Sequence, residues 1–191
     1  MRKIPDEDTD RVHLSAEEAA AMAGADGGDD LGEECKKAFV LACLTGLRVS
    51  DLEELKWGDV DRDRLHKRQH KTGDIAHVPL SASAREIIGG CENHKPDERI
   101  FPLLLERGRD ASNYRIRRLA RTAGIRKRVG WHTARHTFAV LSLEAGTGIY
   151  TLSRLLGHRS VKTTEVYARA TDKLKREAVD ALPDLRIKKL P

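Results

Sequence analysis

An apolar stripe with helical spacing is the feature that most constrains how this chain can fold. In "EECKKAFVLACLTG", residues 33–46, and the next residue, Phe39, Cys43 and Leu47 recur every four positions and are flanked by Val40 and Leu44. This spacing places the apolar side chains on one broad helix face, so it predicts a helix buried in a core. Aromatic residues make up only 4% of the 191 residues, against 39% for all hydrophobic types, so the core must rest on Leu, Ile, Val and Ala. The length suits one domain of ordinary size.

Two capping boxes predict where further helices begin. Ser15 precedes an Ala-rich segment and is followed three residues later by Glu18. In such a pair each side chain bonds the backbone N–H of the other residue, which satisfies donors that a helix start leaves open. Ser50 and Glu53 have the same spacing and predict a second, short helix through Leu55.

The middle of the chain changes character. "RLHKRQHKTGDIAHVPL", residues 64–80, has a Lys-Thr-Gly-Asp turn between two runs that can be extended, and predicts a β-hairpin. Helical signals return at residues 81–90 and 112–125, and the chain is almost wholly helical from His132 on. We therefore expect a mainly α fold with a small antiparallel β-sheet (α+β).

Charge and cysteine usage exclude several classes of protein. The net charge of +5 favours an anionic partner. No apolar run approaches the ~18 residues that a membrane span needs, and the first residues lack the apolar segment of a signal peptide. Cys35, Cys43 and Cys91 are odd in number and lack CxxC spacing, as is typical of reduced cytosolic thiols. We expect a cytoplasmic protein with no membrane partner.

Two basic residues in turns are candidate phosphate-handling groups. Arg48 lies between two predicted helices in "TGLRVSDLEEL". A cation beside a helix N-terminus is unfavourable unless an anion binds there too, so Arg48 is a candidate phosphate ligand and Asp51 a candidate to orient its guanidinium. The alternative is a surface arginine paired with Asp51. Lys71, in the hairpin, is either a solvated lysine or a general acid on a flexible loop.

A His-Arg pair follows on one helix. His132 and Arg135 are three residues apart, so both side chains could point at a single anion. His136, four residues after His132, raises the alternative of zinc. The zinc-protease pattern, however, requires Glu directly after the first histidine, where this chain has Thr133, and no third ligand is evident nearby. We expect no metal, and we expect His136 to be a packed core histidine.

The segment around Tyr167 leaves two interpretations open. Gly157 is suited to the end of a helix, His158 projects from the turn, and Ser160 is expected to cap a helix that holds Tyr167 two turns inside. This helix–turn–helix shape could read a DNA groove, with Tyr167 as a half-buried aromatic. Alternatively, Tyr167 is a nucleophile. Arginines that bind phosphate oxygens, histidines and a lysine that move protons, and an attacking tyrosine suffice for metal-free phosphoryl transfer through a covalent intermediate.

Four boxes in order resemble one family. "TGLRVSDLEELKWGDVD", "HKTGDIAHVPL", "HTARHTFAVLSLEAGTGIYTLSRLLGH" and "SVKTTEVYAR" are similar to the tyrosine recombinases, or phage integrase family, from about His13 to Ala170. The likeness extends to integrases of bacterial conjugative or mobilizable elements. It implies the tyrosine recombinase catalytic-domain fold and a site-specific recombinase that cleaves and rejoins DNA through a 3′-phosphotyrosyl intermediate.

The resemblance also implies a role for each matching residue. Tyr167 would attack the scissile phosphate, Arg48 and Arg135 would clamp its oxygens, His158 would add a hydrogen bond, and Lys71 would protonate the leaving 5′-oxygen.

The same resemblance assigns the two remaining positions and the partners. His132 would assist proton transfer at Tyr167, and Asp51 would support Arg48. No metal or other cofactor is implied, because guanidinium groups take the place of the metal. The implied partner is double-stranded DNA of a bacterial nucleoid, bound by a homotetramer on two duplexes, with a monomer possible when free.

The expected organisation has three parts. Residues 1–12 form a flexible N-terminus, residues 13–170 the catalytic domain, and residues 171–191 a tail that either contacts a neighbouring protomer or is a frayed charged terminus. The N-terminal core-binding domain of the family is expected to be absent. Two other functions stay open: a type IB topoisomerase-like enzyme, and a non-catalytic helix-turn-helix-like DNA-binding regulator.

Overall fold

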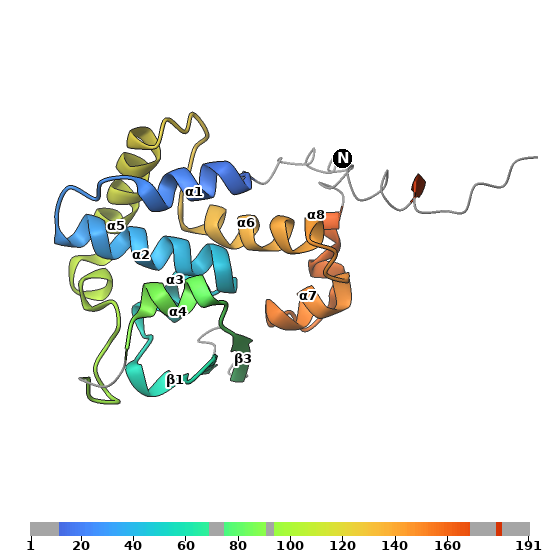
Figure 1. Cartoon of the computed structure of the whole chain (residues 1–191), viewed down its shortest axis with the longest axis horizontal. Helices are drawn as coiled ribbons and strands as arrows, with labels where there is room; N and C mark the ends of the chain where they lie inside the picture. Colours follow the sequence, from blue (N-terminus) through green and yellow to red (C-terminus); the bar gives the residue numbers. More distant parts are fainter. Residues whose placement is uncertain (1–11, 69–74, 91–93, 169–178, 181–191) are drawn as a thin grey trace, which may run out of the picture.

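The computed structural model describes residues 12–68, 75–90, 94–168 and 179–180. The helices of this part are α1 (Ala16–Gly24), α2 (Asp30–Thr45), α3 (Val49–Glu53), α4 (Ala82–Ile88), α5 (Pro102–Thr122), α6 (Trp131–Glu144), α7 (Ile149–Leu155) and α8 (Glu165–Ala168). Three short strands are β1 (Val60–Asp61), β2 (Arg64–Arg68) and β3 (Ile75–Pro79), and two 3-10 turns are η1 (Trp57–Asp59) and η2 (Val161–Thr163). The predicted mainly helical fold with a small antiparallel sheet is confirmed (Figure 1).

Helix α2 is the centre of the core, as its apolar stripe predicts. It packs against α5 and α6, and also against α1 and α4. Phe39 is fully buried, and its ring centre lies 6.1 Å from that of Trp131 at the start of α6. We call the buried set built around α2 the main core.

The first predicted capping box is confirmed and the second is wrong. The Ser15 hydroxyl accepts the Glu18 N–H at 3.2 Å, and the Glu18 carboxylate accepts the Ser15 N–H at 2.8 Å. Helix α3, in contrast, begins at Val49 rather than after Ser50. The reason is that the carboxylate of Asp51 reaches back to the Arg48 N–H, at 3.2 Å, and so starts the helix two residues early.

The hairpin strands form where the sequence predicts them. The sheet order is β1-β2-β3, all antiparallel, with Leu65 opposite Val78 and both side chains buried in the main core. Strand β3 also contacts α7. The turn at residues 69–74, with Lys71, lies outside the described residues, as do most of the N-terminal segment and most of the predicted tail.

The last helices form a second, smaller apolar cluster. Figure 1 shows α7 and α8 at the far end of α6 from α5. We call this buried set the C-terminal cluster; its members are Ala139, Val140, Leu143, Leu152, Leu156 and Tyr167. Within the part of the chain that the structure describes, no helix combines the length and the apolarity needed to cross a bilayer.

Candidate active site

Arg135 is a buried cation held by the ends of two helices. Only 7% of the residue is exposed. Its Nη1 donates to the carbonyl oxygen of Gly46 at 2.5 Å, and its Nη2 donates to that of Leu156 at 2.6 Å. Gly46 and Leu156 are the C-terminal caps of α2 and α7. Helix C-termini carry partial negative charge and open carbonyl groups, so they offset the cost of burying the guanidinium.

Gly46 is required where α2 meets Arg135. Its φ of 71° lies in the left-handed region, which side chains other than glycine rarely adopt. A Cβ at this position would lie 2.5 Å from the Phe138 ring and 3.0 Å from a Leu156 methyl group. Glycine therefore allows the carbonyl of residue 46 to reach the guanidinium.

The charge interactions of Arg135 show that other predicted site residues lie near its guanidinium. Burial and, to a lesser extent, the nearby positive charge of Arg48 lower the pKa of Arg135 to about 10, although Tyr167 and Asp51 act in the opposite direction. A pKa of about 10 still leaves the guanidinium charged at neutral pH. A bound anion would favour that charged form.

Arg48 enters the site from the start of α3. The residue is half-buried, and the fully buried Asp51 carboxylate accepts its backbone N–H. Asp51 thus fixes the backbone at the point from which the Arg48 side chain departs, and its predicted support of the guanidinium stays a prediction.

His158 reaches Arg135 from the turn after α7. Gly157 has a φ of 62°, its N–H bonds the Arg154 carbonyl, and the His158 N–H bonds the Ser153 carbonyl, both at 2.9 Å. This is a Schellman motif, as the glycine predicts. The motif presents the His158 ring with its Nε2 atom 3.2 Å from Arg135 Nη2.

Thr164, which the sequence analysis missed, orients the His158 ring. Its buried hydroxyl lies 2.8 Å from His158 Nδ1. Because a guanidinium can only donate, His158 Nε2 accepts from Arg135, and Nδ1 then carries the proton that Thr164 receives. A threonine among other polar residues gives no signal of such a contact.

Tyr167 lies in the first turn of α8 and is only 4% exposed. The predicted continuous helix from Ser160, with Tyr167 two turns inside, is wrong. The Ser160 side chain makes no capping bond, the segment opens with the 3-10 turn η2, and α8 begins at Glu165. The physical reason is that Thr164, between the two, turns its side chain to His158 and is buried.

The histidine that contacts the Tyr167 hydroxyl is His136. Its Nδ1 atom lies 2.9 Å from the hydroxyl oxygen, and the two ring centres are 5.5 Å apart. The expectation of a packed core histidine is therefore wrong, since the residue is half-buried and faces the tyrosine. His132 is exposed, with its ring centre 6.4 Å from that of His136, and its predicted role at Tyr167 stays a prediction.

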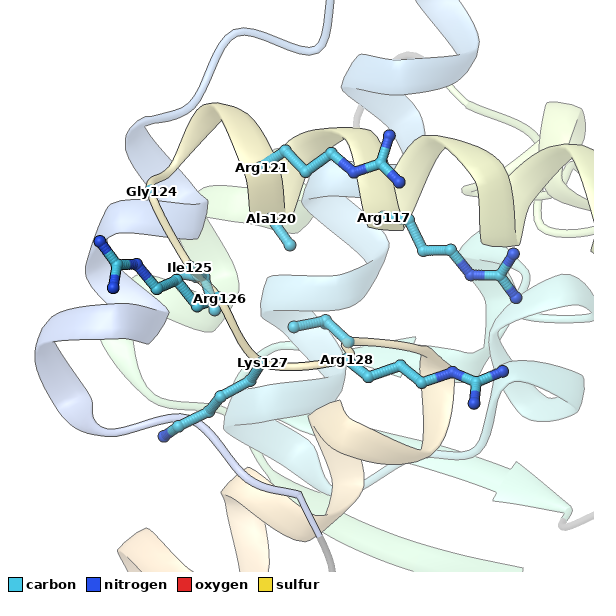
Figure 2. A pocket seen from close by; sticks show the side chains of 9 residues that line it. Arg117, Ala120, Arg121, Gly124, Ile125, Arg126, Lys127 and Arg128 are labelled. Carbon is cyan, nitrogen blue, oxygen red and sulfur yellow. The ribbon is translucent and has the colours of Figure 1, made fainter.

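A basic surface borders this site. We use the name for the exposed arginines Arg117 and Arg121 of α5 and Arg126 and Arg128 of the loop that follows. They line a hollow of about 670 Å³, and Figure 2 shows Arg117 and Arg128 extending toward the same side. A second hollow, of about 290 Å³, is lined by Arg117 and Arg128 together with His132 and so leads toward the site. The run "RIRRLARTAGIRKR" was the available signal for this surface.

The described part of this site is rich in cationic side chains and lacks a set of metal ligands. Among the described residues, no three His, Cys, Asp or Glu side chains come together in a way that could hold a metal ion. The arrangement instead gathers two guanidinium groups, an imidazole and a tyrosine hydroxyl around one position. Such a set can bind a phosphate group and place a nucleophile beside it.

Comparison with known proteins gives the family. The phage integrase family matches residues 13–173. A putative integrase/recombinase of Sinorhizobium fredii is 37% identical over 147 residues, which cover 72% of this chain and 47% of the relative. The tyrosine recombinase XerA of Saccharolobus solfataricus is 31% identical over 142 residues, which cover 72% and 47%. The chain thus spans about half the length of the curated relatives it matches.

Solved structures agree with this assignment. The crystal structure of XerA recombinase superposes with a TM-score of 0.71 at 28% identity, over 96% of this chain and 66% of that one. A lambda integrase tetramer bound to a Holliday junction gives a TM-score of 0.64 at 25% identity, over 82% and 48%. The fold is that of the tyrosine recombinase catalytic domain, and the chain belongs to the phage integrase family.

Proposed function

We propose that this chain is the catalytic part of a site-specific DNA recombinase that cleaves and rejoins strands with Tyr167 as the nucleophile. The observation that carries the proposal is the buried junction of Arg135. There, the ends of α2 and α7 hold a guanidinium next to His158, and that guanidinium interacts electrostatically with Arg48 and Tyr167. Substrate specificity and partners are part of the proposal.

The arginines would bind the non-bridging oxygens of the scissile phosphate. A guanidinium has five N–H donors, and on Arg135 the two helix-end carbonyls and His158 Nε2 take three of them. Because the guanidinium is fixed and partly desolvated before the substrate arrives, its charge stabilises the transition state without further reorganisation. Arg48 would add further oxygen contacts, and His158 would donate to an oxygen when Nε2 as well as Nδ1 carries a proton.

The reaction would exchange one phosphodiester for another. The Tyr167 oxygen forms a bond to phosphorus, the bond to the 5′-oxygen breaks, and the products are a 3′-phosphotyrosyl link and a free 5′-hydroxyl. Lys71 would supply the proton for that leaving oxygen, with His132 assisting proton transfer. The new ester keeps the bond energy, so a 5′-hydroxyl can rejoin without ATP.

Double-stranded DNA is the proposed partner, with four copies of the chain on two duplexes and a monomer when free. The basic surface supports it, since exposed arginines beside a phosphate site can follow the DNA backbone. The lambda integrase neighbour is a tetramer on a Holliday junction. Residues 13–170 would be the catalytic domain, and residues 171–191 would contact a neighbouring protomer on nucleoid DNA.

Covalent trapping on nicked DNA tests the function. The substrates are nicked duplexes from a random-sequence pool and from the ends of candidate mobile elements. They trap the enzyme because the short fragment that carries the new 5′-hydroxyl diffuses away after cleavage. We expect wild type to give a protein–DNA band that survives SDS and disappears with protease. Tyr167→Phe should give none while its DNA affinity stays within about twofold, because only one hydroxyl is lost.

Other results would point to the alternatives. A non-catalytic regulator would bind DNA with no adduct from either protein. A type IB topoisomerase would give the adduct and also relax supercoiled plasmid as a monomer, without joining two duplexes. An adduct that persists in Tyr167→Phe would overturn the assignment of the nucleophile.

A further inference from the structure

We propose that His136 is a catalytic residue: its Nδ1 atom accepts the proton of the Tyr167 hydroxyl during cleavage and returns it during rejoining. The inference rests on the proposed function. It starts from the hydrogen bond of 2.9 Å that joins His136 Nδ1 to the tyrosine oxygen.

The proposed role requires the tyrosine hydroxyl to donate this hydrogen bond to His136. A neutral imidazole has one ring nitrogen that accepts and one that carries a proton. With the phenol donating to Nδ1, the proton of the imidazole sits on Nε2, and the ring is ready to take a second proton. A phenol has an ordinary pKa of about 10, so at neutral pH its attack on phosphorus requires such an acceptor.

The position of His136 on α6 supports the assignment. Its neighbour Arg135 is the buried guanidinium of the proposed phosphate site, so a rigid helix fixes the proton acceptor and the phosphate ligand relative to each other. His132, one turn earlier, is exposed and lines the hollow that contains Arg117 and Arg128. The hydroxyl therefore faces His136, and His132 faces the basic surface.

The step balances in both directions. In cleavage, the Tyr167 oxygen bonds to phosphorus as its proton moves to His136 Nδ1, the P–O5′ bond breaks, and the 5′-oxygen takes a proton from its own donor. In rejoining, the 5′-hydroxyl loses its proton to that donor and attacks phosphorus, and the tyrosine oxygen leaves with the proton from His136. No oxidant, reductant or metal takes part.

The test compares attack on two DNA substrates in a single turnover. One carries a normal nick-adjacent phosphodiester, and the other has sulfur in place of the bridging 5′-oxygen. A thiolate leaves without a proton, so this substrate bypasses the leaving-group acid but still needs an activated tyrosine. His136→Asn is the central variant, because its amide oxygen can accept the hydrogen bond at the Nδ1 position but takes up no proton at neutral pH.

We expect His136→Asn to form adduct about 100-fold more slowly than wild type on both substrates, in the range of a lost general base. Lys71→Ala, in contrast, should be slow on the normal substrate and restored on the sulfur substrate. His94→Gln removes an exposed histidine that stacks on Trp57 and contacts Glu98, and it should match wild type. His136→Gln serves as a second variant, and thermal unfolding shows that each variant is folded.

The outcomes distinguish a failure of the role of His136 from a failure of the proposed function. If wild type forms the adduct and folded His136→Asn and His136→Gln form it equally fast, the role of His136 is wrong and the proposed function stands. If wild type forms no adduct on either substrate, the proposed function is overturned and this proposal with it.

A measurement without DNA tests the hydrogen bond directly. Long-range ¹H–¹⁵N spectra of the wild-type protein should show His136 protonated at Nε2 with Nδ1 as acceptor. In Tyr167→Phe the Nδ1 resonance should shift while that of His94 stays in place. A His136 ring protonated at Nδ1 in the neutral form would overturn the proposal.

Discussion

The main core and the C-terminal cluster differ in how they hold their parts of the site. The main core is built around the 16-residue helix α2, which packs against five other helices of the described chain. The C-terminal cluster has six buried residues, and one of them is Tyr167, the proposed nucleophile. Arg135, the proposed phosphate ligand, lies between them, bonded to Gly46 at one side and to Leu156 at the other.

This difference implies that the main core contributes most of the stability of the domain, and that the C-terminal cluster opens more easily. An element with few buried apolar contacts opens locally at a lower free energy than the core of the same domain. The proposed nucleophile thus lies in the weaker region, and the proposed phosphate ligand is fixed where this region joins the stronger one. Five predictions test this comparison, in order of falling effect.

Phe39→Ala should cause the largest loss of stability. The side chain is fully buried in the main core against Trp131, and deleting such a ring costs about 4 kcal/mol of the free energy of unfolding. Urea denaturation followed by circular dichroism measures the loss. A cost below 1 kcal/mol would mean that α2 is not the centre of the core.

Leu152→Ala is the matched change in the C-terminal cluster. Leu152 is also fully buried, and the substitution should cost about 3 kcal/mol, chiefly by opening that cluster. Hydrogen exchange should accelerate in α7 and α8 while α2 and α5 keep their protection, and adduct formation should slow. Equal loss of protection in α2 would show that the two regions unfold as one.

Gly46→Ala tests the junction itself. The left-handed backbone costs a side chain about 1–2 kcal/mol, and the new methyl group must also displace the Phe138 ring. Gly124→Ala is the control, since its φ of 72° is nearly the same but no atom lies within 4 Å of the added Cβ. Gly46→Ala should be less stable than the control in thermal unfolding and slower in adduct formation, because the carbonyl that holds Arg135 moves. Equal losses of stability in Gly46→Ala and Gly124→Ala would contradict the steric argument.

Tyr167→Phe should cost only about 1 kcal/mol of stability, the contribution of a single hydrogen bond. The ring stays buried in the C-terminal cluster, while His136 loses its partner. Thermal unfolding measures this cost, and hydrogen exchange should show it confined to α6 and α8. A cost above about 3 kcal/mol would make the hydroxyl a structural anchor.

The buried thiols of α2 should show no reaction at all in the native state. Burial raises the pKa of Cys35 to about 12 and raises that of Cys43 as well. Because the folded pKa exceeds the unfolded one, the stability this contributes is present at pH 8 and is lost as the pH rises toward 12. In a Cys91→Ser background, iodoacetamide at pH 8 should label the two thiols only on unfolding of the main core. Phe39→Ala should speed this labelling and Leu152→Ala should not.

Local features of the fold were predictable from the sequence, and features set by distant segments were not. The Ser15 capping box and the Gly157 turn depend on residues close in sequence, and both are confirmed. The start of α3 was missed because Asp51 caps the backbone here, while the Glu53 carboxylate binds Arg109, which is 56 residues away.

The site follows the same division. Arg48, Arg135, His158 and Tyr167 were predicted from residue type and order, and the structure brings them together. The partners of Arg135 are backbone carbonyls 89 and 21 residues away, which have no signature in the sequence. Helix spacing singled out His132 beside Arg135, but the direction from which Tyr167 approaches α6 selects His136. That direction is a property of the tertiary structure.

The most direct test of the central claim is to identify the amino acid that becomes linked to DNA. Protein trapped on nicked DNA would be digested with nuclease and protease, and the peptide that retains a nucleotide sequenced by mass spectrometry. We predict that the nucleotide is attached to Tyr167 through a 3′-phosphate. Attachment to another residue, or through a 5′-phosphate, would contradict the assignment of the active site.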